Sequence, residues 1–435
     1  MRLVAAFALL LLVGLLFGAS MFVYAAYALA ALYFINRTLT RRWTESMSGV
    51  RNISEIESEI GDTVTVALKL TNKDSWPVAW TLVEDLLPPA ALVGPPPALS
   101  IEGENLRMCS VPAKGNRILT YKLTALRRGY FQIGPLVAET GDLFGLQRRF
   151  RTITKPHYWL VLPKVIPLHG YEVASRRPVG EVRVTYRLME DPTLVSGIRA
   201  YQNGDPLRSV HWRATARTGT LQCKQFEPTT VAGATIVVDL HRASNPDHHE
   251  PMRSDLAVTA AASIAHTLMQ MQQQFGLLSN GRDAVDRIAE EQQLREYGSR
   301  ESLRSASAMK TKSDRLRPVH ISTARGPEVF TEMLKTLARL ERTDGLKLPE
   351  LLFEGGSRLP RDATVLVIVQ EVDESAALAL GMLRRQGYSV STIVNNFDNE
   401  AYHQAVGRLL AQHIPVYHLY DEGSVPEICK QLVLR

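Results

Sequence analysis

Side chains that could act as acids, bases or anion-binding cations are concentrated between Gly197 and Pro228. Asp205 precedes Pro206, an order typical of a helix start, because an aspartate accepts the free amide hydrogens and a proline fits the first helical position. The pattern predicts a helix from Pro206 to Thr218, ended by Gly219. The side chains with acid, base, cationic or aromatic character are Arg199, Tyr201, Asp205, Arg208, His211, Trp212, Arg213 and Arg217.

Two interpretations of this segment differ in chemistry. In the favoured structural interpretation, Trp212 is buried between two domains and the arginines bind carboxylates or carbonyl groups across the junction. In the catalytic interpretation, Asp205 and His211 form an acid/base pair while Arg208 holds an anion, as in a hydrolase. No nucleophile accompanies them, and a spacing of six residues places Asp205 and His211 on nearly opposite sides of a helix. Binding of a ligand or partner is the third possibility.

The same residues resemble the signature of a bacterial family called domain of unknown function 58. The matching pattern R-x-Y-x-x-G-D-x-x-R-x-x-H-W-x-x-T-A-R is carried by Arg199, Tyr201, Gly204, Asp205, Arg208, His211, Trp212, Thr215, Ala216 and Arg217. The resemblance implies a membrane-anchored chain with an N-terminal helix hairpin, a β-sandwich and a C-terminal von Willebrand factor A-like domain. It also implies a MoxR-type AAA+ ATPase as partner, since such ATPases are often encoded beside members of the family.

Composition narrows the class of protein. The chain has 435 residues, a formal net charge of +6 and 3 cysteines. This length indicates two or three domains. The charge excess is mild and no finger or helix-turn-helix spacing is present, so nucleic acid is not an expected partner. Three distant cysteines indicate neither a disulfide framework nor a metal cluster, and they suit a reducing compartment.

Residues 3–35 are apolar almost throughout and are followed by Arg37, Arg41 and Arg42. Because one helix of this length exceeds a bilayer core, the sequence predicts a transmembrane hairpin within residues 1–36, with arms Leu3–Phe17 and Met21–Ile35. A cleaved signal peptide is the alternative. The arginines predict that both ends of the hairpin are cytoplasmic, which places the bulk of the chain on the cytoplasmic side of a bacterial inner membrane. A basic linker is expected at residues 37–50.

Residues 51–162 alternate polar and apolar side chains between turns, which predicts an immunoglobulin-like β-sandwich. We expect one strand over Gly129–Thr140, and Trp76 and Trp80 in the core. Residues 163–232 form a linker that carries the signature segment.

Residues 233–435 alternate short buried strands with helical patterns, which predicts a doubly wound parallel sheet of von Willebrand factor A-like type. A long helix is expected over Ser254–Phe275. The fold class is therefore α/β plus all-β.

The first strand of A-like domains usually ends in Asp-x-Ser-x-Ser, which holds a divalent cation. Asp239 matches, but His241 and Ala243 replace the hydroxyl residues, so Asp239 is only a weak metal candidate and no cofactor is expected. Asp247-His248-His249-Glu250 is an alternative source of transition-metal ligands, most simply interpreted as a solvated loop. The side chains that could share this edge of the sheet are Ser322, Thr323, Asp373 and Glu374.

These features predict a non-enzymatic, membrane-anchored interaction or adaptor protein. Its expected partners are the lipid bilayer and a MoxR-type AAA+ ATPase, in assembly or maturation of other proteins. The alternative is a hydrolase-like enzyme that uses Asp205, Arg208 and His211.

Overall fold

The computed structural model describes residues 20–142, 148–167, 190–202, 209–228, 233–293, 317–360 and 364–433, together with Leu12 and Leu16. The chain divides into two compact units. The first comprises residues 1–164, 282–315 and 334–344, and the second comprises residues 165–281, 316–333 and 345–435. The predicted first arm of the hairpin, Leu3–Phe17, lies outside the described residues except for Leu12 and Leu16.

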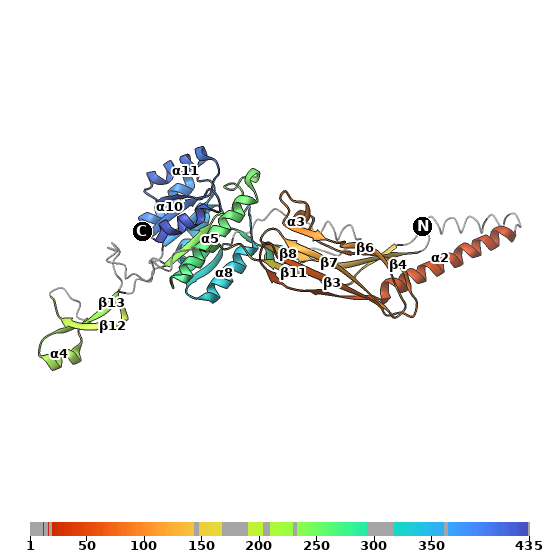
Figure 1. Cartoon of the computed structure of the whole chain (residues 1–435), viewed down its shortest axis with the longest axis horizontal. Helices are drawn as coiled ribbons and strands as arrows, with labels where there is room; N and C mark the ends of the chain where they lie inside the picture. Colours follow the sequence, from red (N-terminus) through yellow and green to blue (C-terminus); the bar gives the residue numbers. More distant parts are fainter. Residues whose placement is uncertain are drawn as a thin grey trace. The chain divides into compact units, whose positions relative to one another are not determined.

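A single long helix, α2 (Ser20–Ser46), opens the described part of the first unit (Figure 1). Within the described chain it is the one helix long and apolar enough to cross a membrane, although a signal sequence would pass the same test. Its apolar side chains do not form a protein core, because only 11% of its most apolar window is buried. The helix continues through Arg37 and Arg42 to Ser46, so the linker predicted at residues 37–50 is wrong. Met47 already belongs to the first strand.

The β-sandwich follows without a break. Its strands are β1 (Met47–Ile53), β2 (Glu57–Ser58), β3 (Thr63–Asn72), β4 (Val78–Asp85), β5 (Leu99–Glu102), β6 (Leu106–Val111), β7 (Asn116–Ala125), β8 (Gly129–Ile133), β9 (Leu136–Gly141), β10 (Arg148–Thr152) and β11 (His157–Val161), with a short helix α3 (Pro89–Val93) after β4. They form sheets of order β1-β3-β7-β5, β10-β9-β4-β6 and β2-β11-β8. The strand predicted over Gly129–Thr140 is divided at Gly134, whose φ of 86° suits glycine and ends β8.

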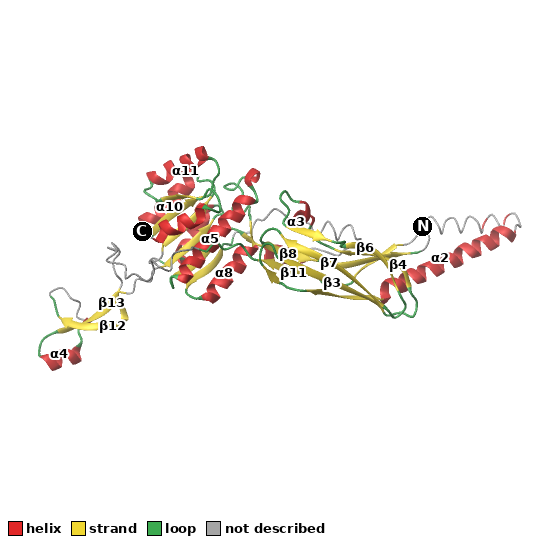
Figure 2. Ribbon diagram, in the orientation of Figure 1, coloured by secondary structure: helices red, strands yellow, loops and turns green. Residues whose placement is uncertain are grey.

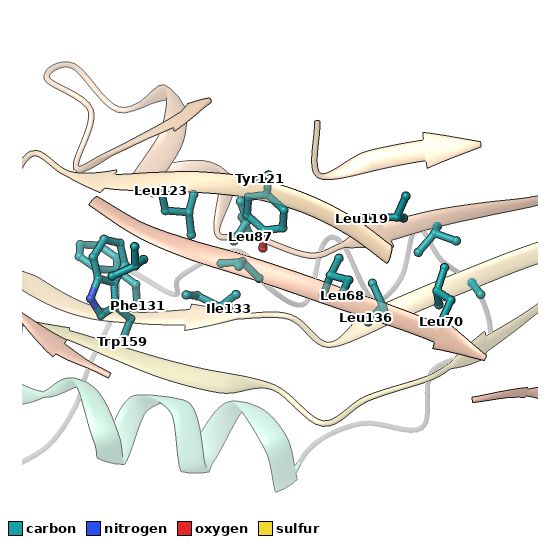
Figure 3. Packing of buried hydrophobic residues seen from close by; sticks show 14 of the residues in the cluster. Leu68, Leu70, Leu87, Leu119, Tyr121, Leu123, Phe131, Ile133, Leu136 and Trp159 are labelled. Carbon is teal, nitrogen blue, oxygen red and sulfur yellow. The ribbon is translucent and has the colours of Figure 1, made fainter. Parts of the chain in front are cut away.

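One apolar cluster joins all three sheets (Figure 3). The period-two alternation of β3 places Val64, Val66, Leu68 and Leu70 in this cluster, since successive side chains of a strand point to opposite faces. The expectation of a buried Trp76 is wrong, because this side chain is 54% exposed. Trp159 on β11 and Trp43 at the end of α2 are the buried indoles of the sandwich.

A buried ion pair crosses the sandwich interior. Arg51 on β1 and Asp85 at the end of β4 have fully buried side chains. The Arg51 Nε lies 3.1 Å from Asp85 Oδ2, its Nη1 donates to the Lys155 carbonyl at 2.8 Å, and the Tyr121 hydroxyl donates to Asp85 Oδ2 at 2.6 Å. Burial, followed by the charge of Asp85, raises the pKa of Tyr121, so the phenol stays a donor. Gly134 leaves room for this cluster, because a Cβ there would overlap the Arg51 guanidinium.

The second unit contains a six-stranded sheet of order β17-β15-β14-β19-β20-β21 (Figure 2). Five strands are parallel, and the edge strand β17 is antiparallel to β15. The strands are β14 (Gly233–Val238), β15 (Gln274–Ser279), β17 (Val319–Ala324), β19 (Thr364–Val369), β20 (Ser389–Val394) and β21 (Val416–His418). The helix expected over Ser254–Phe275 ends earlier, because α5 spans Met252–Gln270 and β15 begins at Gln274.

Helices connect these strands and cover both faces of the sheet. On one face, Val237, Val365 and Val367 pack against a core formed with α9 (Leu348–Gly355), α10 (Glu374–Arg385) and α11 (Asn399–Ala411). The alternate side chains Ile236 and Leu366 are also buried but lie outside that cluster. The two faces are therefore both covered, as in a doubly wound sheet. The second unit also contains η3 (Asp247–His249), η4 (Gly356–Arg358) and α12 (Ser424–Val433). β16 (Arg282–Asp283), α6 (Ala284–Gln293) and β18 (Leu340–Glu341) belong to the first unit, and α8 (Pro327–Arg339) continues from the second unit into the first.

Arg51→Ala should lower the free energy of unfolding by about 3 to 5 kcal/mol, because it leaves the Asp85 carboxylate buried without its cation. The measurement is denaturant unfolding of the full-length chain in detergent. Lys122→Ala, which breaks the exposed pair with Glu102, is the matched control and should cost less than about 1 kcal/mol. Equal effects of the two changes would contradict the assigned role of the buried pair.

Candidate functional site

The signature segment folds as a hairpin, here named the signature hairpin, of β12 (Glu190–Ala200), α4 (Trp212–Thr218) and β13 (Gln222–Pro228). Its two strands pair antiparallel, with Ile198 opposite Lys224. The helix is attached to β13, since the His211 amide donates to the Gln222 carbonyl at 2.7 Å and the Gln222 amide donates to Thr215 Oγ1 at 3.0 Å. Figure 2 shows α4 beside the two strands.

The helix begins later than predicted. It starts at Trp212 instead of Pro206, and its N-cap is His211, whose Nδ1 accepts a hydrogen bond from the Ala214 amide at 3.1 Å. The His211 imidazole therefore caps the helix, which is the role that the sequence predicted for Asp205. Gly219 ends the helix with a φ of 69°, as predicted. Gly204, Asp205 and Arg208 lie outside the described residues, and the predicted Asp205–His211 pair therefore does too.

The described signature side chains are largely on the surface. Trp212 is 66% exposed, so the expected burial of its indole is wrong. Arg213 and Arg217 are exposed on α4, Tyr201 and Thr215 are half-buried, and the Arg199 guanidinium donates to the Ala200 carbonyl at 3.2 Å.

A second set of residues gathers at the carboxyl end of β14. Asp239 is 2% exposed, and both of its oxygens accept hydrogen bonds. Oδ2 accepts from the Ser244 hydroxyl at 2.5 Å, while Oδ1 accepts from the Asn280 amide group at 2.7 Å and from the His241 backbone amide at 3.0 Å. Asn280 also accepts from the Leu240 amide at 2.8 Å, which fixes its orientation. Protein donors thus take the positions at which the oxygens would bind a cation.

Burial raises the pKa of the Asp239 carboxyl above its ordinary value, and the bonds from Ser244, Asn280 and the His241 amide oppose that shift. His241 itself is buried and its Nδ1 accepts from the Ala243 amide at 3.1 Å. The Ser244 hydroxyl, the Asn280 side chain and the His241 backbone amide therefore form a closed turn around the carboxylate.

A cavity of about 290 Å³ opens next to this turn. It lies where β14 and β19 separate toward their respective helices, the position at which open α/β sheets bind ligands. Its volume is near the lower limit of small-molecule pockets, which suits one side chain or a small ligand. The polar and charged side chains around it are Asp239, His241, Ser244, Lys347, Glu371, Asp373, Gln404 and Arg408.

Several of these groups already have partners within the wall of the cavity. Asp373 is the N-cap of α10 and accepts from the Ala376 amide at 2.7 Å. Arg408 on α11 donates to the Val372 carbonyl at 2.6 Å. Lys347 and Glu371, one of each charge, are exposed at the cavity. The arrangement can hold a zwitterionic or mixed-charge group, and it offers no paired acid and base for proton transfer among the described residues.

The other residues expected at this edge of the sheet are only partly found there. Asp373 lies there, as expected. Ser322 and Thr323 do not, because β17 is antiparallel and the Thr323 hydroxyl contacts that of Thr235 at 3.1 Å, near the amino end of β14. His248 and His249 form the short helix η3, with ring centroids 3.8 Å apart. The described residues contain no group of three or more His, Cys, Asp or Glu side chains placed to hold a metal.

Sequence reasoning missed Arg253, which is fully buried in α5. Its Nη1 donates to Asn395 Oδ1 at 2.7 Å and to the carbonyls of Leu419 and Tyr420 at 3.2 and 3.1 Å. Desolvation lowers the pKa of Arg253 to about 10. The residue joins α5 to the ends of β20 and β21. An arginine in the first turn of a helix gives no sequence signal for such a role.

Residues 197–315 match the family described as "Protein of unknown function DUF58". The chain is also 24% identical over 240 residues to the uncharacterized protein YeaD of Bacillus subtilis (strain 168). That alignment covers 55% of this chain and 57% of YeaD, so the chain spans little more than half of its relative. The family resemblance that the signature indicated is therefore confirmed over residues 197–315.

Similarity to solved structures is limited to parts of the chain. The CARDB domain of the PF1109 protein from Pyrococcus furiosus has 12% sequence identity and a TM-score of 0.18, with 26% of this chain and 91% of that chain covered. Proximal thread matrix protein 1 from the mussel byssus has 9% identity and a TM-score of 0.30, with 46% and 47% covered. The architecture therefore rests on the strand pairings and the cores described above.

Trp212→Ala should change the free energy of unfolding by less than about 0.5 kcal/mol, because the indole is exposed. Trp159→Ala, which removes a fully buried indole, should cost about 3 to 5 kcal/mol. Unfolding of the two variants in denaturant makes the comparison. A large loss of stability in Trp212→Ala would show that the indole is buried in the protein in solution.

Asp239→Asn should become more stable relative to the parent as the pH rises. Because the folded-state pKa of Asp239 lies above the unfolded value of 3.8, its favourable contribution is complete below that value and is lost as the pH rises through the folded pKa. The thermal midpoints of both proteins, measured from below pH 3.8 to above the folded-state pKa, give the difference. Millimolar magnesium should shift neither midpoint; a rise in the parent alone would show that Asp239 binds the cation.

Proposed function

We propose that this protein is a membrane-anchored interaction protein whose signature hairpin binds an acidic surface of a partner protein. The observation that carries the proposal is the exposure of Trp212 next to the cations of α4. Exposed tryptophan and arginine are the side chains that contribute most to protein interfaces. The catalytic alternative gains no comparable support, since His211 Nδ1 is engaged as a helix cap.

The signature hairpin has little interior of its own. Of residues 197–202 and 209–224, three are buried, Ser209, Val210 and Cys223. Three apolar side chains are exposed instead, Ile198 at 49%, Trp212 at 66% and Leu221 at 43%. An isolated two-stranded hairpin is marginally stable in water. Contact with another surface therefore supplies the burial that the hairpin lacks.

Charge defines the chemistry of that surface. Residues 197–202 and 209–224 include Arg199, Arg213, Arg217 and Lys224 and no aspartate or glutamate. Complementary charge steers association and suppresses wrong partners. An acidic patch with an apolar centre fits both features. The resemblance to the family makes a MoxR-type AAA+ ATPase the candidate partner.

Membrane anchoring is supported by α2, whose apolar side chains face outward, and by the arginines that follow them. The distribution of these arginines favours a cytoplasmic location for the sandwich and the α/β region, at the inner membrane of a bacterium. For the α/β region, the strand order with an antiparallel edge strand supports a von Willebrand factor A-like fold. Asp239 then occupies the first position of a cation site that the chain has closed.

The test measures binding of the full-length chain in detergent to a purified MoxR-type ATPase. Trp212→Ala and the double variant Arg213→Glu/Arg217→Glu should each weaken binding by about tenfold or more, because they remove an aromatic anchor or reverse the charge. Lys122→Glu, on the sandwich, is the control and should bind like the parent. Undiminished binding by both hairpin variants would refute the proposed surface, and hydrolysis of an ester or phosphate substrate that is lost in His211→Ala would favour an enzyme.

A further inference from the structure

The end of the sandwich at which α2 enters is assembled from three segments, here named the α2-proximal end: residues 46–48, 72–77 and 112–116. The Lys73 amide donates to the Ser46 carbonyl at 3.0 Å, at the last residue of α2. The Lys114 amide donates to the Asp74 carbonyl at 2.9 Å, and the Asn72 amide donates to the Gly115 carbonyl at 3.0 Å. Backbone hydrogen bonds thus fix both loops to the end of the helix.

The helix is fixed to the sandwich as well. Trp43 and Met47 are buried in the sandwich core, 5% and 2% exposed. Arg151 on β10 donates to the Glu45 carbonyl at 2.8 Å and thereby satisfies a carbonyl that the end of the helix leaves free. The α2-proximal end therefore keeps one orientation relative to α2.

Charge is segregated along the sandwich. Lys73 and Lys114 are exposed at the α2-proximal end, together with the indole of Trp76. The nearby acids are engaged: Glu45 pairs with Arg41 at 2.8 Å, and Asp74 accepts from the Ser75 amide at 2.7 Å. The segment that follows β1 at the opposite end carries four exposed acids, Glu55, Glu57, Glu59 and Asp62, of which Glu57 pairs with Lys335 at 2.6 Å.

Helix geometry places this basic end close to a bilayer that α2 crosses. From Arg37, the first cation after the apolar run, to Ser46 the helix rises about 14 Å at 1.5 Å per residue. The headgroup layer is about 5 to 7 Å thick on each side of the hydrocarbon core. The remaining gap is about one Debye length at physiological salt, roughly 8 Å, so the cations lie within the field of charged headgroups.

From this placement we infer that the α2-proximal end is a second membrane contact, selective for anionic phospholipid headgroups. Lys73 and Lys114 attract the headgroup phosphates across this short gap, and the exposed indole of Trp76 faces the interfacial layer, where tryptophan is enriched. The inference rests on the proposed insertion of α2. It adds a preference for anionic lipids and a defined orientation of the sandwich relative to the membrane. This contact explains why Trp76 is exposed, although the sequence predicted it in the core.

The test uses the full-length chain with Ser75→Cys in nanodiscs, labelled with a fluorophore and quenched by a lipid that carries a nitroxide on its headgroup. Cys109, Cys223 and Cys429 are buried, so the label attaches to the introduced thiol. Quenching should be about twofold stronger in discs with anionic phosphatidylglycerol than in discs of phosphatidylcholine alone. The difference should disappear in about 1 M salt, where the Debye length is about 3 Å.

Lys73→Glu/Lys114→Glu should abolish the dependence on phosphatidylglycerol, whereas Arg107→Glu/Lys122→Glu, which changes the net charge equally elsewhere on the sandwich, should retain it. Equal quenching in the two lipids, or equal behaviour of the two double variants, overturns the inference. Alkaline carbonate extraction of vesicles separates this result from a failure of anchoring. A chain that stays in the pellet without lipid-dependent quenching refutes the headgroup contact alone, and a chain that is extracted refutes the insertion of α2 as well.

Discussion

The buried ion pair between Arg51 and Asp85 is the interaction on which the arrangement of the first unit depends. It joins β1 to β4, and through the Lys155 carbonyl and the Tyr121 hydroxyl it also reaches the segment before β11 and strand β7. One charged cluster therefore links all three sheets. Because β1 is the direct continuation of α2, the same cluster holds the strand through which the helix is attached. Burial of both charges makes the geometry strict, since a misplaced partner would leave the other ion desolvated.

The second unit satisfies its buried carboxylate differently, and this difference separates two kinds of surface. Asp239 is enclosed by hydroxyl, amide and backbone donors at the carboxyl end of β14. The adjoining cavity keeps a mixed-charge lining that includes the exposed side chains of Lys347 and Glu371. The signature hairpin has the opposite character, with exposed apolar groups and cations and a minimal interior. Recognition of another molecule suits the hairpin better than a reaction at the sheet edge does.

Patterns with a strong local cause could be predicted from the sequence. The alternation of β3 and the continuous apolar runs of β14 and β19 follow from which faces are buried, and strands form in both regions for which the sequence predicted them. The break at Gly134 is marked in the sequence by the Gly134-Pro135 pair, and the end of α5 is followed by a glutamine-rich stretch up to Gln274, so the expected spans Gly129–Thr140 and Ser254–Phe275 were too long. The polar–apolar pattern also did not predict which individual aromatic residues are buried. Trp76 and Trp212 are exposed on a loop and a short helix, whereas Trp159 lies in a strand whose last three residues are all buried. The capping role of His211 depends on where the helix starts, which several neighbouring polar residues leave ambiguous.

The absence of a flexible joint between α2 and β1 has a mechanical consequence. A helix that spans a bilayer adapts to its thickness by tilting. Because Trp43 and Met47 are anchored in the sandwich core, the sandwich turns with the helix as a rigid body. Under the proposed insertion of α2, a thinner or thicker membrane would change the angle between the sandwich and the lipid surface. Bilayer thickness would then set the orientation of the sandwich.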